Sequence, residues 1–283
     1  MQSIRTAGQK YLSETVSPLG ATLVRYLFAA PFALLYVLWL LINRASTLPE
    51  PNCTFLLAGI AASILQIFAT VLLVRLLTLR NFAVGSCYIR TEVLATALLG
   101  LLLFGELVSG LGWFAMLVCV SGLLIITIAR SGRVKELWNT AALYGLAAGL
   151  ALALTALLIR QASLSFGIED AIFTAALTLV YMVLIQTIIC LSFLLVRNAS
   201  EMKVIFRQWR AGLFVGTTSL IGSIGWFTAF TLERAAYVRT VGQLEFLVTL
   251  GISILFFKEV PSRLELIGML ILVIGVVVLL ISP

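Results

Sequence analysis

The chain has 283 residues, of which 61% are hydrophobic and 11% are charged, and its mean hydropathy is +1.13. A soluble domain carries roughly 25% charged residues, so this composition excludes a soluble globular protein and indicates an integral membrane protein. The net charge of +7 is attributed to basic loops between membrane spans, and nucleic acid is not an expected partner.

Apolar stretches separated by polar breaks predict nine membrane spans. They reach about 20 residues without strict alternation of polar and apolar side chains, which favours helices over barrel strands. In chain order they cover residues 19–42, 55–77, 82–104, 107–128, 141–164, 168–196, 211–232, 236–257 and 264–281. The sequence therefore predicts an all-α integral membrane protein.

An ungapped tandem repeat runs through these spans. Residues 92–126 read EVLATALLGLLLFGELVSGLGWFAMLVCVSGLLII, and residues 245–279 read EFLVTLGISILFFKEVPSRLELIGMLILVIGVVVL. The two stretches share 12 of 35 positions at an offset of 153 residues. The shared residues include Glu92/Glu245, Thr96/Thr249 and Gly122/Gly275, which are not the usual filling of membrane helices. The chain is therefore predicted to consist of two repeats, 1–131 and 132–283.

The two repeats differ in their number of predicted spans. Residues 141–281 hold five and residues 19–128 hold four, while residues 1–13 resemble the last half of a further helix. We therefore expect ten helices with the first truncated and Met1 not the true start; the alternative is a nine-span protein with an interfacial stub. Five spans per repeat would insert the second copy upside down, an inverted-topology repeat. The excess of Lys and Arg in alternate loops predicts an outward-facing C-terminus.

Glu92 and Glu245 are the leading candidates for function, because carboxylates are rare inside membranes and usually functional there. Glu92 lies near the middle of its predicted span, and helical spacing places polar or small residues above and below it. The candidate substrate- or proton-binding residues on these two spans are Tyr88, Arg90, Glu92, Thr96, Arg239, Gln243, Glu245 and Thr249.

Arg90 and Arg239 leave two interpretations open. Arg90 is two residues from Glu92 and points to nearly the opposite side of one helix. The carboxylates could couple transport to protons or bind a cation, or they could form a structural Glu–Arg network between helices. The interior carboxylates and aromatic rings suit a cationic or zwitterionic ligand, whereas the arginines suit an anion.

Polar and aromatic residues elsewhere in the spans complete the candidate set. Gln66 and Trp226 are further candidates, although Trp226 is more simply a packing residue. Arg25 is expected to lie shallow enough to reach the membrane interface. Glu106 and Glu259 fall in short turns, each just before a serine that starts the next helix, and a capping role is expected.

The residue types limit the chemistry. The chain has no histidine, and its four cysteines have no metal-ligand spacing, so no metal or cofactor is expected. The phosphate-binding pattern GxxxxGK[ST] is absent, which removes ATP hydrolysis from this chain. An enzyme acting on lipid-linked substrates would need a nucleophile or metal ligands, and we do not expect an enzyme.

The repeated segments LLLFGELVSGLGWFAMLVCVSGLLII and ILFFKEVPSRLELIGMLILVIGVVVLL, with SPLGATLVRYLFAAPFALL around Arg25, resemble the EamA-like branch of the drug/metabolite transporter superfamily. The resemblance covers the whole chain. It implies a ten-helix basket of two inverted five-helix repeats that moves small metabolites or drugs, often by proton exchange, and usually has both termini inside.

The expected function is a secondary active transporter of a small organic metabolite, as an exporter or permease, multi-pass in the cytoplasmic (inner) membrane. Its partners would be the substrate and the lipid bilayer, with the protein a monomer or homodimer. A passive channel or a non-transporting scaffold is the alternative, although a channel would be expected to show rings of one charge.

Overall fold

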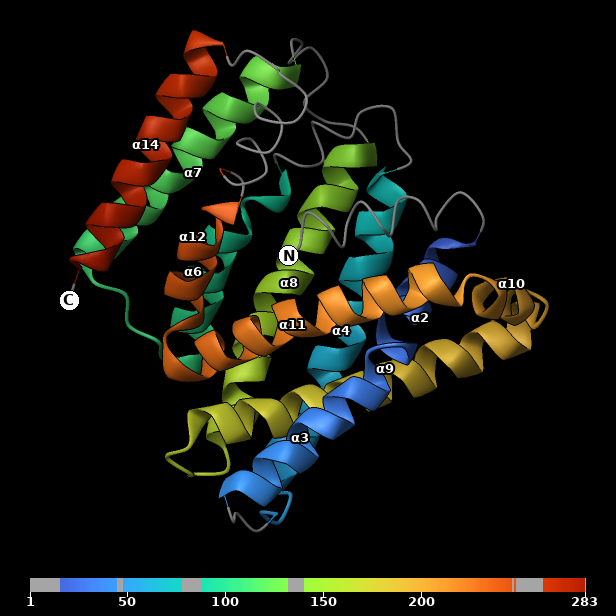
Figure 1. Ribbon diagram of the computed structural model, residues 1–283. Helices are drawn as coiled ribbons and strands as arrows, with labels where there is room; N and C mark the ends of the chain where they lie inside the picture. The colour runs from blue at the N-terminus through green and yellow to red at the C-terminus, as the bar shows by residue number, and fades with distance from the viewer. Residues whose placement is uncertain are drawn as a thin grey trace. The chain divides into compact units, whose positions relative to one another are not determined.

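The computed structural model describes residues 16–44, 48–77, 88–131, 140–245, 247 and 262–282. Within these residues it is helical, with no strand. The helices are α2 (Pro18–Leu27), α3 (Ala30–Arg44), α4 (Cys53–Leu77), α6 (Glu92–Phe104), α7 (Gly110–Ser131), α8 (Thr140–Leu164), α9 (Ala171–Asn198), α10 (Glu201–Arg207), α11 (Trp209–Leu232), α12 (Ala235–Gly242) and α14 (Arg263–Leu280) (Figure 1).

Seven stretches of the described residues are long and apolar enough to cross a membrane, and α6 is a shorter apolar helix. They confirm the predicted all-α membrane class. Two predicted spans are only partly described: residues 82–87 and most of 246–257 lie outside the described residues. The predicted span 19–42 is interrupted at Phe28–Ala29, between α2 and α3. Pro31, which has no backbone N–H to donate, lies in the first turn of α3.

The helices form two compact units. Unit 1 comprises residues 1–75 and 155–233, and unit 2 comprises residues 76–154 and 234–283. Each unit takes helices from both sequence repeats, so the contact units do not coincide with the two repeats predicted from the sequence.

Unit 1 packs the α2–α3 break against α11. A Cβ atom added to Gly212 would lie 2.5 Å from the Phe28 ring, and one added to Gly216 would lie 2.7 Å from the Phe28 carbonyl carbon. Helix α9 contacts α2, α3 and α11 in the same unit. The two glycines thus admit the interrupted segment to close contact, as small residues do at membrane helix interfaces.

Unit 2 is built around the crossing of α7 and α14, which run side by side and antiparallel (Figure 1). A Cβ atom on Gly122 would lie 2.7 Å from the Gly268 carbonyl oxygen, and one on Gly275 would lie 3.0 Å from the Ala115 carbonyl oxygen. The 153-residue offset of the repeat relates Gly122 to Gly275 and Gly268 to Ala115, so the two contacts are equivalent. The equivalent helices α7 and α14 therefore run in opposite directions, as expected for inverted copies.

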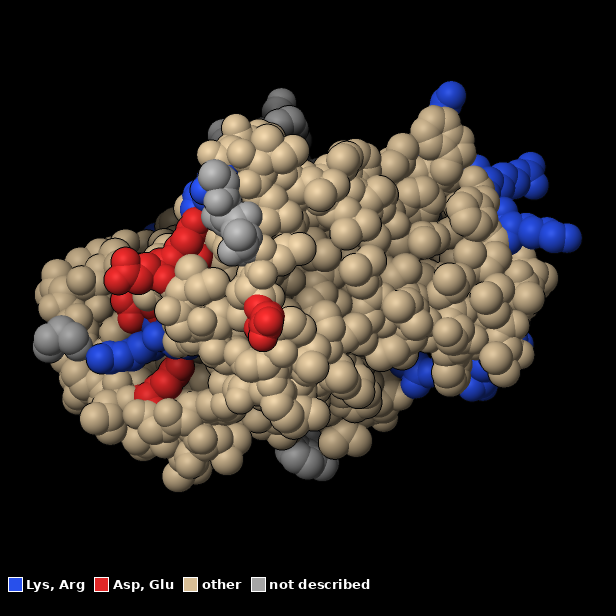
Figure 2. All heavy atoms as spheres, turned by 90° about the horizontal axis from the view of Figure 1, so that it is seen from below, with Lys and Arg blue, Asp and Glu red and all other residues tan. Residues whose placement is uncertain are grey.

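The surface fits a lipid environment. Large apolar side chains stay exposed on several helices, including Leu35 and Trp39 on α3 and Leu270 on α14. Figure 2 shows one face with broad areas free of charged side chains, and basic side chains at the edge over α10. The exposed basic residues near α10 are Arg197, Lys203, Arg207 and Arg210.

Candidate functional site

Glu92 is placed by the start of α6 and not by the middle of one continuous helix. Residues Arg90 and Thr91 form a turn before α6, and the Thr91 hydroxyl donates to the Tyr88 carbonyl oxygen at 2.6 Å. Such local side-chain hydrogen bonds compete with regular helix. The predicted stripe through Tyr88 and Glu92 is therefore interrupted, while Glu92, Thr96 and Gly100 share the buried side of α6.

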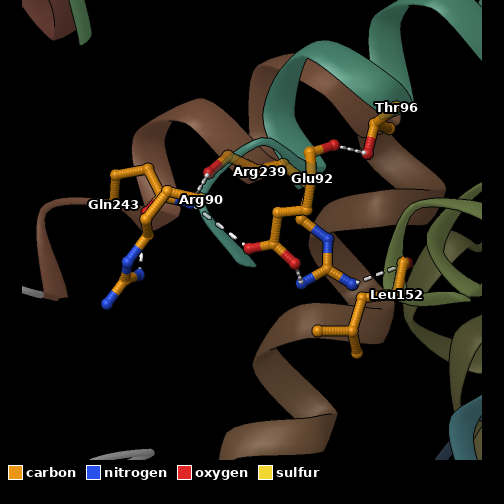
Figure 3. A network of polar contacts seen from close by, with 6 residues as sticks. All are labelled: Arg90, Glu92, Thr96, Leu152, Arg239 and Gln243. Carbon is orange, nitrogen blue, oxygen red and sulfur yellow. Dashed lines mark hydrogen bonds and ion pairs between the residues drawn. The ribbon is translucent and has the colours of Figure 1, made fainter. Parts of the chain in front are cut away.

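A buried ion pair joins Glu92 of α6 to Arg239 of α12. The Glu92 Oε2 atom lies 3.4 Å from Arg239 Nη1, and the two residues are 6% and 8% exposed. The Arg239 Nη2 atom also donates to the Leu152 carbonyl oxygen of α8 at 3.0 Å. The three helices thus meet around one guanidinium group (Figure 3).

Gln243 extends this contact to Arg90. Its amide nitrogen donates to Glu92 Oε1 at 3.4 Å and to the Arg239 carbonyl oxygen at 3.1 Å, and its amide oxygen accepts from Arg90 Nη1 at 2.9 Å. Arg90 was predicted to point away from Glu92; it nonetheless joins the same set of contacts through Gln243 (Figure 3). We call Arg90, Glu92, Arg239 and Gln243 the Glu92 network.

The Glu92 carboxylate retains unused capacity. Apart from the ion pair, its Oε2 atom is buried without a hydrogen bond among the described residues. Its position in the first turn of α6 places it where the helix dipole favours negative charge. The carboxylate is therefore held by one charged partner and a long amide contact, which a proton or a cationic group could replace.

The remaining candidates on these two spans are not all brought into this network. The Thr96 hydroxyl donates to the Glu92 carbonyl oxygen at 2.6 Å and so bonds its own helix. Tyr88 and Glu245 are half-buried, and Thr249 lies outside the described residues. Glu92 and Glu245, which the repeat relates, thus differ in exposure.

Gln66 and Trp226 belong to unit 1. The Gln66 amide oxygen accepts from the Gln186 amide nitrogen at 2.7 Å. The Trp226 ring packs on Phe230, with 5.4 Å between ring centroids. Arg25, expected at the membrane interface, is instead buried at 7% exposure.

The two serines that follow Glu106 and Glu259 each cap the helix that they start. Ser109 accepts from the Gly112 backbone N–H at 3.0 Å before α7. Ser262 accepts from the Glu265 N–H and donates its own N–H to the Glu265 carboxylate, a capping box at the start of α14. Glu106 is half-buried beside Ser109, and Glu259 lies outside the described residues.

Two contacts escaped sequence reasoning. The Leu152 carbonyl is a backbone group and leaves no signal in the sequence. Arg160 of α8 donates to the carbonyl oxygens of Phe230 and Glu233 at 2.8 and 2.7 Å, which satisfies carbonyls at the end of α11. A basic residue near the end of a predicted span was the available signal.

No group of His, Cys, Asp or Glu in the described part of the chain could hold a metal ion. Cys119 and Cys190 are buried, and burial in apolar surroundings is the usual state of an inert thiol. The ionisable chemistry shown inside unit 2 is therefore that of carboxylate, guanidinium and amide groups.

Comparisons with known proteins identify the family. The sequence profile of the EamA-like transporter family matches residues 2–128 and 139–281. No curated protein matches the chain significantly. One solved structure, described as "Crystal structure of protein", superposes with a TM-score of 0.70 at 13% identity, covering 98% of this chain and 91% of that one. At this identity the likeness concerns the fold alone.

Proposed function

Because the chain belongs to the EamA-like transporter family, we propose that it is a secondary active transporter that exchanges a small organic metabolite or drug for protons. We further propose that its two repeats are those of residues 1–131 and 132–283. The membrane would be the cytoplasmic one, and export the working direction.

The observation that supports this proposal is the Glu92–Arg239 ion pair. Glu92 comes from the first repeat and Arg239 from the second, and both side chains are buried. An uncompensated charge is costly in apolar surroundings, so either side chain needs a partner in every state of the protein. A pair held at 3.4 Å, whose carboxylate oxygen makes no further hydrogen bond among the described residues, is suited to exchange partners.

The proposed coupling follows from charge balance. When the guanidinium lies against Glu92, the carboxylate is compensated and needs no proton. When a conformational change draws Arg239 away, a proton takes its place on the carboxylate, and the freed guanidinium needs another partner. Gln243 would keep one carboxylate oxygen hydrogen-bonded in either case.

The experiment uses the full chain in proteoliposomes on a solid-supported membrane. A panel of organic acids, amino acids, nucleosides, sugars and quaternary amines is injected with and without a pH gradient. We expect a compound-specific current that depends on pH in the wild type. Glu92→Gln is expected to abolish the proton-dependent current, because a neutral amide cannot take up and release the proton.

The matched control is Glu265→Gln, which makes the same change at another buried glutamate. Glutamine can still complete the capping box of α14, so this variant should keep its pH-dependent current. Unchanged pH dependence in Glu92→Gln would remove Glu92 from the coupling. Flux that only ever runs down the substrate gradient, with no response to pH, would instead support a passive channel.

A further inference from the structure

A cavity inside unit 1 holds a charged side chain that the rest of the described protein leaves without a counterion. The enclosed part of the cavity has room for about one water-sized group, and the wider space of about 280 Å³ between atoms includes the part open to the outside. Its polar side is formed by Arg25 of α2, Gln66 of α4, Gln186 of α9 and Ser219 and Ser223 of α11. All of these residues belong to unit 1, whereas the Glu92 network belongs to unit 2.

Arg25 is the central group. It is 7% exposed, and guanidinium stays charged at any physiological pH. Its contacts are the Thr70 hydroxyl at 3.4 Å and the face of Tyr26, with the guanidinium carbon 5.3 Å from the ring centroid. No carboxylate of the described chain lies within ion-pair distance of Arg25. A buried guanidinium with only a long hydroxyl contact and an aromatic ring retains most of its donors for an anion.

One further group that lines the cavity lacks a hydrogen bond, and two others are fixed by each other. The Ser219 hydroxyl is 3% exposed and makes no hydrogen bond with the described residues. The Gln186 amide nitrogen is committed to the Gln66 oxygen at 2.7 Å, which fixes the orientation of both amides. Buried polar groups are nearly always hydrogen-bonded. A hydroxyl without a hydrogen bond and a guanidinium without a counterion line the same cavity, so both would be satisfied by one ligand.

We propose that this cavity binds the carboxylate group of a small organic monoanion, with Arg25 as its counterion and Ser219 as a hydrogen-bond donor. One guanidinium compensates one negative charge and matches the two oxygens of a carboxylate. None of the residues that line the cavity is acidic, so a ligand ammonium group would have no charged partner there.

The rest of the lining specifies the body of the ligand. Leu179, Val183, Leu220 and Phe227 form the apolar side of the cavity. Small-molecule sites combine a mostly apolar wall with a few fixed polar groups. The ligand is therefore a small monocarboxylate whose apolar or aromatic body extends from the enclosed part of the cavity into its open part. This inference rests on the proposed function only in naming that ligand as the substrate; binding itself can be measured without transport.

The test measures binding of benzoate to the purified full chain in detergent by isothermal titration calorimetry. Benzamide serves as the neutral isostere, benzylammonium as the cation of similar size, and inorganic phosphate as a different anion. We expect benzoate to bind, and to bind more tightly than the other three probes. Wild-type protein that binds no benzoate, or that prefers phosphate or benzylammonium, overturns the proposal.

Variants locate the site. Arg25→Met is expected to weaken benzoate binding by at least about 30-fold, because it removes the charged partner of a buried carboxylate. Arg197→Gln is the matched control, since it also removes one positive charge but from an exposed position on α9. It should leave the affinity unchanged. Ser219→Ala is expected to weaken binding about 10-fold.

A second measurement separates a ligand-binding arginine from a structural one. If Arg25 is uncompensated in the ligand-free protein, Arg25→Met should unfold at the same or a higher temperature than the wild type, because methionine fills similar space without a buried charge. A large fall in unfolding temperature with unchanged benzoate affinity overturns the proposal. Arg25-dependent benzoate binding without any transport supports this site and contradicts the proposed function. If the protein does not bind benzoate but transports compounds without a carboxylate in exchange for protons, the proposed function is supported and this site is contradicted.

Discussion

Two helix crossings in unit 2 use the same repeat in different ways. At the crossing of α7 and α14, the contacts of Gly122 and Gly275 are exchanged by the 153-residue offset, and the interface is made of small and apolar groups. At the meeting of α6 and α12, the offset pairs Arg90 with Gln243, and the contacts are polar. The first crossing keeps the symmetry of the repeat, and the second departs from it.

The difference shows at which positions the packing of the helices restricts the residue type in both repeats. Close backbone approach requires small residues on both helices, and both repeats carry glycine or alanine at these contacts. At the second crossing the equivalent positions carry arginine in one copy and glutamine in the other, and the first copy's glutamate belongs to the Glu92 network. The repeat is thus asymmetric where charge is held, as expected around an asymmetric ligand or a proton.

The largest loss of stability is expected when the ion pair at the polar crossing of α6 and α12 is broken. Glu92→Leu or Arg239→Met alone should lower the free energy of unfolding by about 3–5 kcal/mol, because each leaves an uncompensated buried charge. The double variant should be close to the wild type in stability and inactive in transport. Equilibrium unfolding in mixed micelles measures all four proteins. Additive losses in the double variant would show that the two charges do not stabilise each other.

Substitutions at the symmetric crossing of α7 and α14 should lower the free energy of unfolding by a smaller amount. Gly122→Ala places a Cβ atom 2.7 Å from the Gly268 carbonyl oxygen and the Leu272 backbone nitrogen, and overpacking of this kind costs about 1–3 kcal/mol. Gly110→Ala, on the same helix, has no atom within 4 Å of its new Cβ and should be neutral or slightly stabilising. Equal stability of the two variants in thermal unfolding would contradict the close approach.

The asymmetry of the polar crossing can be tested by exchange. Gln243→Leu removes one acceptor of Arg90 and should lower the free energy of unfolding by about 1–2 kcal/mol. The double exchange Arg90→Gln with Gln243→Arg restores an arginine–glutamine contact across the crossing, with the charge on the other helix. We expect it to recover stability but to alter the pH dependence of transport. Recovery of both would show that the side on which the charge lies has no role in coupling.

The smallest effect concerns an exposed ion pair, used as a reference for the buried one. Arg44 donates to Asp170 before α9, and this hydrogen bond holds the pKa of Asp170 below its ordinary value of 3.8 despite partial burial. A lowered carboxyl pKa contributes stability above the unfolded-state pKa and loses it as the pH falls through the folded-state value. Asp170→Asn keeps the helix cap, so its small stability deficit at pH 7 should vanish in acid.

The predicted membrane class and most span positions followed from hydropathy, because the membrane requires long apolar helices. The prediction was wrong about the course of the chain at Glu92, where a turn at Arg90 and Thr91 precedes α6. One turn within an apolar stretch is too local a feature for a hydropathy pattern to reveal.

The candidate site was predicted in its residue types and not in its pairings. Glu92, Arg90, Arg239 and Gln243 were all chosen as charged or polar groups within apolar spans. Which of them touch depends on how separate helices pack, and the sequence carries no such distance. Arg25 shows the same limit: its depth in the span suggested the interface, while packing with α9 and α11 buries it.

The contact between Cys119 and Leu272, with the thiol 3.7 Å from the carbonyl oxygen, joins two positions that the repeat relates to each other. If the two repeats exchange conformations during a working cycle, each residue takes on the environment of the equivalent residue in the other repeat. Cys119 and Leu272 are equivalent to each other, so the exchange leaves this pair a contact between the same two residues. The distance between Cys119 and Leu272 is then the same in both end states. The Gly122–Gly268 distance of one end state becomes the Ala115–Gly275 distance of the other, and the reverse. A pair of spectroscopic labels at positions 119 and 272 would therefore give a constant reference distance, against which movement elsewhere in unit 2 can be measured.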